Sequence, residues 1–227
     1  LEWLKRRPGP RLLYASTSEA YAGSCNPYST PPIPTPEDVP LAVADIKNPR
    51  FSYAASKILA EAAVVAYAQA SGVPAVIVRY HNVFGPRMGY EHVIPELSLR
   101  LLRRQEPFVL YGVDQSRAFC YVSDAVEGTI KAMTAASRAV DIFHIGNDSQ
   151  EIVINDLLKR LCVVSGITPR TVDPRPAPPG SPARRCPDLS KARQVLGYEP
   201  QVGLDQGLKL TFDWYWAKHP QGLVEPR

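Results

Sequence analysis

Residues 52–80 read SYAASKILAEAAVVAYAQASGVPAVIVRY, and this stretch carries the strongest fold signal in the chain. Residues 52–71 are rich in Ala, contain no Pro or Gly and repeat apolar residues at helical spacing, so they predict a helix that ends before Gly72. Residues 75–80 form an apolar run that is typical of a buried strand, and a similar run at residues 11–15 predicts a strand before the helix. Strand, helix and strand in this order predict a βαβ unit with a parallel sheet.

The rest of the chain also alternates between helix and strand signals. Two Pro-rich stretches, residues 27–49 and 169–187, are interpreted as ordered loops. A helix running to about residue 136 is predicted to begin at a side-chain cap formed by Ser123 or Asp124. We predict further strands over residues 108–111, 119–122 and 142–145, and helices over residues 92–104, 154–165, 189–196 and 204–218. The expected fold class is therefore α/β.

The composition excludes several classes of protein. Of the 227 residues, 45% are hydrophobic and 21% are charged, which excludes a wholly disordered chain. No apolar run approaches the roughly 18 residues needed to cross a bilayer, so we expect no membrane partner. The net charge of +4 is small and scattered, which does not predict a nucleic-acid surface. The four cysteines, Cys25 among them, form no C-x-x-C pair, so we expect no metal site and a cytoplasmic location.

A tyrosine and a lysine lie four residues apart near the start of the first predicted helix. Tyr53 and Lys57 would share one helix face, about one turn from each other. An ammonium group beside a phenol stabilises the phenolate, which can exchange a proton with a substrate hydroxyl. The pair alone is weak evidence, because Y-x-x-x-K often arises by chance on solvated helix faces.

A polar turn, residues 16–21 (STSEAY), directly follows the first predicted strand. Ligands of open α/β sheets bind beyond the carboxyl ends of the strands. An ordinary turn would use the same types of residue. The position of this turn ahead of Tyr53 and Lys57, in a strand–loop–helix–strand order, favours a ligand-binding role.

Five segments together resemble the extended short-chain dehydrogenase/reductase family, specifically its NAD-dependent nucleotide-sugar epimerases and dehydratases. They are residues 13–21 (LYASTSEAY), 48–57 (NPRFSYAASK), 79–88 (RYHNVFGPRM), 117–124 (RAFCYVSD) and 188–192 (DLSKA) with 196–200 (LGYEP). Each segment is weak evidence alone, whereas their order and spacing together match the family.

The resemblance implies the C-terminal part of a Rossmann-type doubly wound parallel sheet, plus a small α/β substrate-binding region. Residues 1–87 would form the C-terminal half of the dinucleotide-binding domain. Residues 88–112 and 147–203 would form the substrate-binding region. Residues 113–146 and 204–218 would pack back on the Rossmann domain.

The resemblance also implies roles for individual residues. The catalytic residues would be Thr17, Glu19, Tyr53 and Lys57. The NAD-binding residues would be Ser16, Tyr53, Lys57, Tyr80, Asn82 and Val83, and NADP stays an alternative cofactor. The substrate-binding residues would be Ser18, Asn82, Arg87, Arg117 and Arg185. For His81 and His92 we expect a structural role, because no ligand spacing links them to the other two histidines.

The reaction that the resemblance implies is modification of a nucleotide-diphosphate sugar through a 4-keto intermediate. An epimerase, a dehydratase and a decarboxylase are the three outcomes. The triplet Thr17-Ser18-Glu19 resembles UDP-glucuronate decarboxylases and GDP-mannose 4,6-dehydratases, and the lack of an acid at position 18 disfavours a glucose-type dehydratase. We therefore favour a UDP-sugar 4-epimerase or a UDP-glucuronate decarboxylase, although Glu19 as a simple turn cap is also open.

Two further implications concern assembly and class. In the family, the helix that carries the Tyr-Lys pair forms a homodimer, and Ala-rich residues 52–71 would permit such close helix packing. The alternative class is a non-catalytic dinucleotide-binding or scaffolding protein on the same fold. Such a protein would normally lack Tyr53 or Lys57, and both are present.

The family's phosphate-binding motif, G-x-x-G-x-x-G, does not occur in these 227 residues. We therefore expect an N-terminal segment of about four strands with their helices to precede this chain in the complete protein. The chain by itself should be inactive, because half of the cofactor cleft would be missing. Purified chain incubated with NAD and UDP-sugars should give no product by chromatography, and measurable turnover would contradict this expectation.

Overall fold

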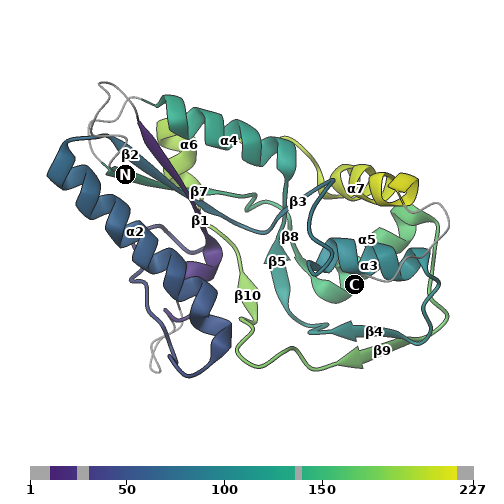
Figure 1. The fold of residues 1–227 in the computed structure, drawn as a ribbon. Coiled ribbons are helices and arrows are strands. Elements are labelled where there is room, and N and C mark those ends of the chain that lie inside the picture. The colour runs from purple at the N-terminus through teal and green to yellow at the C-terminus, as the bar shows by residue number, and fades with distance from the viewer. Residues whose placement is uncertain (1–10, 25–30, 136–139, 219–227) are drawn as a thin grey trace.

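A three-stranded parallel sheet organises one side of the molecule (Figure 1). The computed structural model describes residues 11–24, 31–135 and 140–218, so Cys25 lies outside the described residues. The strand order is β1-β2-β7, and helices cover both faces of the sheet. The bounds are Leu12–Thr17 for β1, Ala75–Tyr80 for β2, Val140–Ile145 for β7, Ser52–Ser71 for α2, Val122–Thr134 for α4 and Ser190–Leu196 for α6.

Helix α2 covers one face of this sheet, and α4 with α6 covers the other. Alternate residues of β2 serve the two faces: Ile77 packs in the cluster with Val64 of α2, whereas Val78 packs in the cluster with Ala125 of α4. Both faces are buried, which explains the unbroken apolar run in the sequence. The predicted helix 52–71 is confirmed, and Gly72 ends it in the left-handed conformation (φ 71°).

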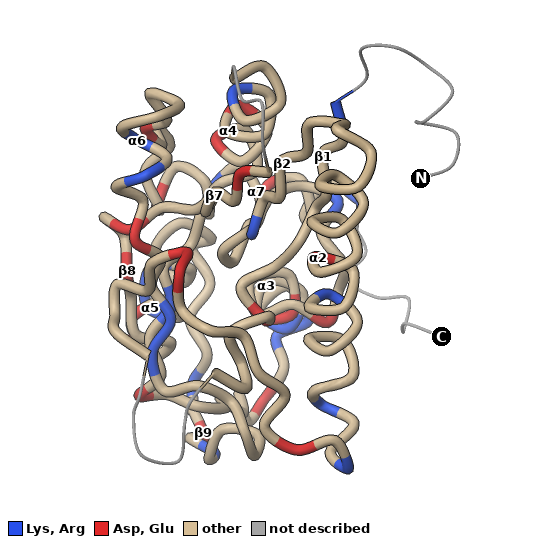
Figure 2. Tube along the Cα trace, turned by 90° about the vertical axis from the view of Figure 1, so that its left-hand side faces the viewer, with Lys and Arg blue, Asp and Glu red and all other residues tan. Residues whose placement is uncertain are grey.

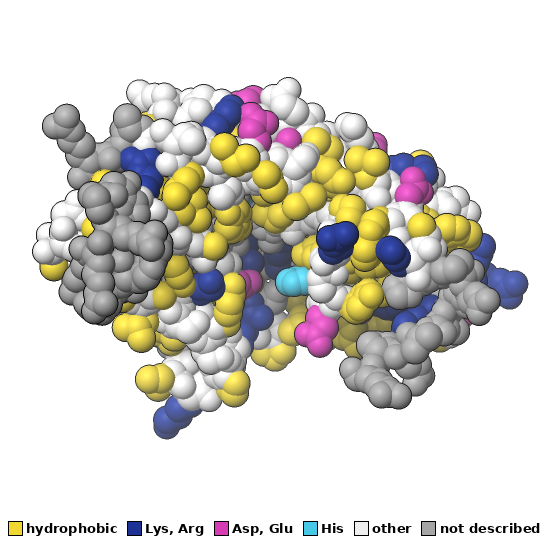
Figure 3. Space-filling model, turned by 45° about the horizontal axis from the view of Figure 1, so that its top comes forward, with side chains coloured by type: hydrophobic (Ala, Val, Ile, Leu, Met, Phe, Trp, Pro, Cys, Tyr) yellow, Lys and Arg dark blue, Asp and Glu magenta, His cyan; other side chains and the backbone are white. Residues whose placement is uncertain are grey.

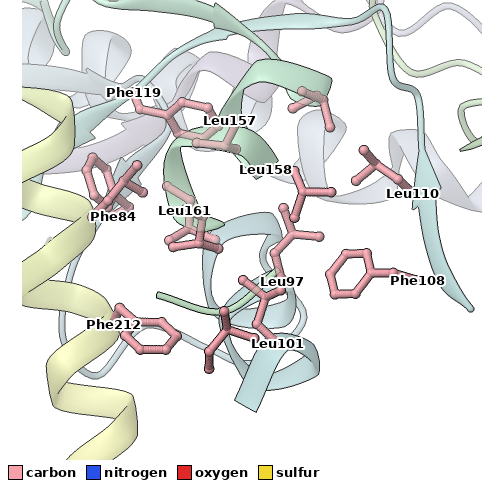
Figure 4. Close-up of a cluster of buried hydrophobic side chains, with 14 residues drawn as sticks. Phe84, Leu97, Leu101, Phe108, Leu110, Phe119, Leu157, Leu158, Leu161 and Phe212 are labelled. Atoms are coloured by element: carbon pink, nitrogen blue, oxygen red, sulfur yellow. The ribbon is translucent and has the colours of Figure 1, made fainter. Parts of the chain in front are cut away.

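The sheet β1-β2-β7 with α2, α4 and α6 forms one lobe of the molecule, and the helices α3, α5 and α7 form the core of the second lobe. Figure 4 shows leucine and phenylalanine side chains from α3, α5, α7 and neighbouring strands pointing toward one another. Phe108 and Leu157 in this cluster are fully buried. The bounds are Val93–Leu102 for α3, Ile154–Ser165 for α5, Leu204–Lys218 for α7, Phe108–Tyr111 for β4 and Val172–Arg175 for β9, and the two strands pair in parallel.

Short strands lie where the two lobes meet. The strand β5 pairs with β8 on one edge and with β10 on the other, and β3 pairs with β6. The bounds are Val83–Phe84 for β3, Ser116–Ala118 for β5, Cys120–Tyr121 for β6, Glu151–Val153 for β8 and Arg184–Arg185 for β10. Most of these strands were not predicted, because two or three residues are too few to show a periodic pattern.

The predicted cap of α4 is wrong. The helix begins at Val122 with Tyr121 at the N-cap, and no side chain caps it. The Asp124 carboxylate accepts a hydrogen bond from the Val202 amide at 3.0 Å instead. The Asp124 carboxylate, which was predicted to cap α4, therefore makes a contact with a distant segment instead.

Two helices pack against a different lobe from the one expected. Residues 204–218 were expected to pack on the Rossmann domain, but α7 contacts α3 and α5 through Leu208 and Phe212. Conversely, α6 lies within the expected substrate-binding region but packs on β7 and α4 through Ala192. Apolar stripes alone do not indicate which lobe a helix covers.

Candidate active site

The polar turn after β1 and the start of α2 lie against each other. The turn is a 3₁₀ helix, η1 (Ser18–Tyr21), and α2 packs on both η1 and β1. Thr17 caps η1, because its Oγ1 accepts a hydrogen bond from the Glu19 amide at 3.2 Å. Lys57 Nζ donates to the Ala15 carbonyl oxygen at 2.8 Å. The carboxyl end of β1 and the Tyr-Lys face of α2 are thereby held at one edge of the sheet.

Tyr53 and Lys57 form a pair that is open to solvent on one side. Lys57 Nζ lies 5.7 Å from the centre of the Tyr53 ring and 5.1 Å from that of Tyr14. The Tyr53 side chain is 52% exposed. The phenol is therefore accessible to a ligand, and the ammonium group beside it is fixed in place by a backbone carbonyl.

A polar cavity of about 380 Å³ extends between the two lobes. Its wall includes Glu19 from η1, Arg50 from the entrance to α2, and Arg117 and Arg185 from the paired strands β5 and β10. The far wall comes from α3 and β4. The surface is hollowed near the centre of Figure 3, where basic, acidic and histidine side chains gather.

Cations dominate one wall of this cavity. Arg117 and Arg185 are direct neighbours in the β5–β10 register. Burial, together with the charge of Arg185, lowers the pKa of Arg117 to about 10. Two guanidinium groups held side by side repel each other, so the cavity favours an anion that binds both of them.

Glu19 is the acidic partner in this group. Its Oε1 lies 2.7 Å from Arg185 Nη1, and its Oε2 lies 4.0 Å from Arg50 Nη2. Burial acts to raise the pKa of Glu19, but Arg185, Arg50 and Arg117 outweigh burial and hold that pKa below its usual value. Glu19 is therefore an ionised acceptor at neutral pH and not a proton donor.

Other residues singled out in the sequence make contacts within the protein. The Ser16 hydroxyl is buried and donates to Glu61, and Ser18 is also buried. The Tyr80 hydroxyl lies 2.6 Å from Thr129 Oγ1. These three side chains do not line the cavity.

The R-x-x-N segment divides between the cavity and the surface. Asn82 lines the cavity, adopts φ 40° and donates from Nδ2 to the Ala118 carbonyl oxygen at 3.0 Å. Val83 lies in β3, next to it in the chain. Arg87 is exposed, adopts φ 66° and is absent from the wall of the cavity.

The sequence reasoning missed a buried ion pair beneath the site. Arg79 binds the Glu61 carboxylate with both Nε and Nη2, at 3.0 Å and 2.6 Å, and both side chains are almost fully buried. Arg79 Nη1 also donates to the Tyr21 hydroxyl. A signal was present, because Arg79 is the charged residue of an apolar strand and Glu61 is the acid of an Ala-rich helix. Arg50 was also missed, and only its place beside Tyr53 could have indicated it.

Residues 1–146 match the model of the NAD dependent epimerase/dehydratase family. The chain belongs to that family. The family predicted from the sequence motifs is thus confirmed, and so is its dependence on NAD. The α/β class with a parallel, Rossmann-type sheet is confirmed by the neighbours described next.

Curated relatives and solved structures agree with the family. UDP-N-acetyl-alpha-D-glucosaminuronate decarboxylase of Bacillus cytotoxicus is 32% identical, over 90% of this chain and 63% of that protein. UDP-glucuronic acid decarboxylase 4 of Arabidopsis thaliana is 34% identical, over 91% of this chain and 45% of that protein. The chain thus spans about half of the length of the curated relatives it matches.

Two solved epimerases have the same fold. UDP-glucose 4-epimerase from Thermotoga maritima with UDP-glucose aligns with a TM-score of 0.81 at 27% identity, over 96% of this chain and 67% of that chain. UDP-glucuronic acid 4-epimerase from Bacillus cereus, in complex with UDP-glucuronic acid and NAD, gives 0.81 at 25% identity, over 96% and 65%.

The described residues of this epimerase/dehydratase family member fit the nicotinamide ribose half of NAD. The Lys57 ammonium carries three donors, of which the Ala15 carbonyl takes one, and the adjacent Tyr53 phenol is half exposed. Ribose hydroxyls suit such a donor set. A glycine-rich loop for the pyrophosphate does not occur in the sequence.

The charged residues show no single concentrated stripe. Lys and Arg lie over both lobes among Asp and Glu (Figure 2). In the part of the chain that the structure describes, no helix is long and apolar enough to cross a bilayer. The same residues contain no cluster of His, Cys, Asp and Glu that could hold a metal ion.

Two buried histidines lie behind the site. His144 Nε2 is 2.7 Å from the Tyr21 hydroxyl, and the His81 ring centre is 4.5 Å from that of His144. Neither ring nitrogen of His81 has a hydrogen-bond partner among the described residues. Burial lowers the pKa of His144 to about 3 and the pKa of His81 well below its usual value.

These lowered pKa values predict a loss of stability in mild acid. Below the usual histidine pKa of about 6.5, the unfolded chain binds protons that the folded chain excludes. The free energy of unfolding should therefore fall by about 2 kcal/mol per histidine between pH 6.5 and pH 5. Urea unfolding at several pH values measures this change.

The control is His81→Phe, which keeps a ring but removes one titrating group. Its pH dependence over the same range should be about half that of the unaltered chain. Glu37, whose pKa is raised by burial, acts in the opposite direction in both proteins and so does not affect the comparison. If the free energy of unfolding of His81→Phe depended on pH as steeply as that of the unaltered chain, this would contradict the lowered pKa of His81.

Proposed function

We propose that the complete protein modifies a UDP-sugar through a 4-keto intermediate, with NAD as its cofactor. The observation that carries the proposal is the polar cavity, in which Arg117 and Arg185 lie side by side and Glu19 is held 2.7 Å from Arg185. A pair of guanidinium groups suits a diphosphate. The decarboxylases and epimerases described above, which are named for UDP-sugars, support the same substrate class.

The first step uses the edge where β1 meets α2. The Tyr53 phenolate takes the proton of the sugar 4-hydroxyl, either directly or through the Thr17 hydroxyl. Lys57 binds the nicotinamide ribose and stabilises the phenolate. NAD, when bound, supplies the reversible oxidation at C4. Thr17, Tyr53 and Lys57 thus orient the sugar and move one proton.

Other residues bind the two ligands. Arg117 and Arg185 bind the diphosphate, while Asn82 lies between sugar and cofactor. We assign Ser16, Tyr80 and Val83 to the cofactor side, and Ser18 and Arg87 to the substrate side. Since the Ser16 and Tyr80 hydroxyls hydrogen-bond to Glu61 and Thr129, any contact they make with the cofactor is through backbone or ring.

The fate of the keto sugar that we favour is decarboxylation of a UDP-uronate. A 4-keto uronate is a β-keto acid, which loses its carboxylate readily. Glu19 is ionised and held by Arg185, so it can orient the sugar by accepting hydrogen bonds but cannot protonate a leaving hydroxyl. Together with Ser18 at the position of an acid, this disfavours a glucose-type dehydratase.

A UDP-sugar 4-epimerase is the second candidate, and its support is the likeness to the two solved epimerases. The same first step would be followed by reduction on the other face of the sugar. A non-catalytic binding or scaffolding role is less well supported, because Tyr53 is accessible and Lys57 is in place beside it.

We further propose a cytoplasmic homodimer that binds neither nucleic acid nor membrane. Residues 1–87 would serve the cofactor, and residues 88–112 with 147–203, apart from α6, would serve the substrate. The support for the dimer is the outer face of α2. Leu59 on this face is 72% exposed, and Ala63 and Ala66 beside it are exposed and small.

Two variants of the complete protein test the reaction. Tyr53→Phe keeps the ring but removes the proton acceptor, so turnover should fall by roughly 10²–10⁴-fold with little change in sugar affinity. The second variant is Glu19→Gln, which keeps the size of the side chain but removes its charge. If Glu19 acts after oxidation, this variant should accumulate NADH and a 4-keto sugar, measured by absorbance and mass spectrometry. Unimpaired interconversion of C4 epimers by Glu19→Gln would contradict the decarboxylase and leave the epimerase.

The dimer is tested by placing a charge on the outer face of α2. Leu59→Glu should turn the dimer into a monomer in sedimentation velocity at micromolar concentration, because it buries an unpaired carboxylate in the interface. Val163→Glu on α5, where Val163 is 80% exposed, is the matched control and should stay dimeric. A monomeric unaltered protein would refute the proposed dimer.

A further inference from the structure

Arg50 is a third guanidinium group on the wall around Glu19, and it enters from a different element from Arg117 and Arg185. Arg100, also in the wall of the cavity, pairs with Glu96 of its own helix. It lies in the short 3₁₀ helix η2 (Pro49–Phe51), which runs directly into α2. Asn48 fixes this entrance, because its Oδ1 accepts a hydrogen bond from the Arg50 amide at 3.1 Å. Arg50 is thus presented to the cavity by the helix that carries Tyr53 and not by the β5–β10 pair.

The guanidinium group of Arg50 makes no hydrogen bond within the described part of the chain. Its Nε is buried without a partner, and its Nη2 is 4.0 Å from the nearest acid, Glu19. Glu19 is already bound by Arg185 at 2.7 Å. By contrast, Arg117 donates to Ser116 and Gln115. The two Nη groups of Arg50 therefore have donors left for a ligand, whereas its Nε is covered by the protein.

The surroundings of Arg50 strengthen any hydrogen bond that its guanidinium group makes to a ligand. Gly180 adopts φ 78°, and a Cβ at that position would lie 3.1 Å from Arg50 Cδ and 3.3 Å from Nε. The backbone at Gly180 thus covers the stem of the side chain and keeps water from Nε. A hydrogen bond to a partly desolvated guanidinium group is stronger than one made in open solvent.

The position of Arg50 indicates which part of a substrate it meets. It precedes Tyr53 by three residues in one continuous helical segment, so their Cβ atoms are about 5–6 Å apart. A ligand whose C4 hydroxyl reaches Tyr53 places the substituents of the neighbouring ring carbon near Arg50. The nucleotide would then lie toward the wall formed by α3 and β4, on the other side of the arginines that suit the diphosphate.

We propose that Arg50 is a specificity-determining residue that binds a carboxylate on C6 of the sugar, so that the site prefers a nucleotide hexuronate to the neutral nucleotide hexose. The inference rests on the proposed function, because it takes a UDP-sugar as the ligand. Arg185 offsets the charge of Glu19, so a second carboxylate can enter beside it. A hydroxymethyl group at C6 would leave the Arg50 charge uncompensated.

The test is calorimetric binding of UDP, UDP-glucose and UDP-glucuronate to this chain at neutral pH. The unaltered chain should bind UDP-glucuronate more tightly than UDP-glucose. Arg50→Gln should reduce that preference by about 10-fold or more, since it removes a charge-assisted hydrogen bond. Arg50→Lys keeps the charge but loses the planar fork and should reduce the preference by less.

Arg184→Gln is the matched control. Arg184 is exposed, pairs with Glu151 at 2.7 Å and does not line the cavity, so its removal should leave the preference unchanged. The ratio of two affinities on one variant does not depend on the fraction of folded protein. If Arg50→Gln fails to fold by circular dichroism, Arg50→Lys decides.

Each remaining outcome overturns a defined statement. Equal weakening of both sugars and of UDP by Arg50→Gln would make Arg50 a diphosphate or structural residue and refute the proposal. An unchanged preference would refute it as well. Failure of the unaltered chain to bind any of the three ligands would instead overturn the assignment of this cavity to a nucleotide sugar, on which the proposal depends.

Discussion

The buried ion pair between Arg79 and Glu61 holds together the elements on which the site depends. Arg79 comes from the central strand β2 and Glu61 from α2, and the Ser16 hydroxyl of β1 donates to the same carboxylate. The Tyr21 hydroxyl of η1 receives Arg79 Nη1. Removing one partner would leave an unpaired buried charge, which costs about 3–5 kcal/mol. The pair therefore makes the spacing between α2 and the turn after β1 a rigid property of the fold.

The 3₁₀ helix η1 transmits that rigidity to the cavity. Its last residue, Tyr21, belongs to the buried network of Arg79 and Glu61, and its hydroxyl also hydrogen-bonds to His144. Glu19 on the same short helix faces the arginines of the cavity. Burial raises the pKa of Tyr21 to about 12, so its hydroxyl keeps its proton and stays a donor to His144. Because η1 is held in place at Tyr21, the Glu19 carboxylate on the same helix loses little conformational entropy when a ligand binds.

Charge imbalance is what makes the cavity selective. Around Glu19, three guanidinium groups, those of Arg50, Arg117 and Arg185, meet one carboxylate, whereas the rest of the wall holds Arg100 together with Glu91 and Glu96. An anionic ligand offsets the mutual repulsion of the three guanidinium groups around Glu19, which favours its binding. Two arginines on paired strands suit a diphosphate, and the third, which comes from the catalytic helix, suits a further anionic group.

Local pattern was sufficient for the long elements, because helix periodicity and buried apolar runs are visible within one segment. Residues 52–71, 75–80 and 154–165 were predicted at the bounds that the structure has. Motif resemblance was likewise sufficient for the family. The sequence could not show that Arg50 and Arg185, which lie in distant segments, reach the same cavity, or that α7 covers α3 and α5. Those facts depend on contacts between distant segments, which form only when the whole chain packs, and no periodicity within a single segment records them.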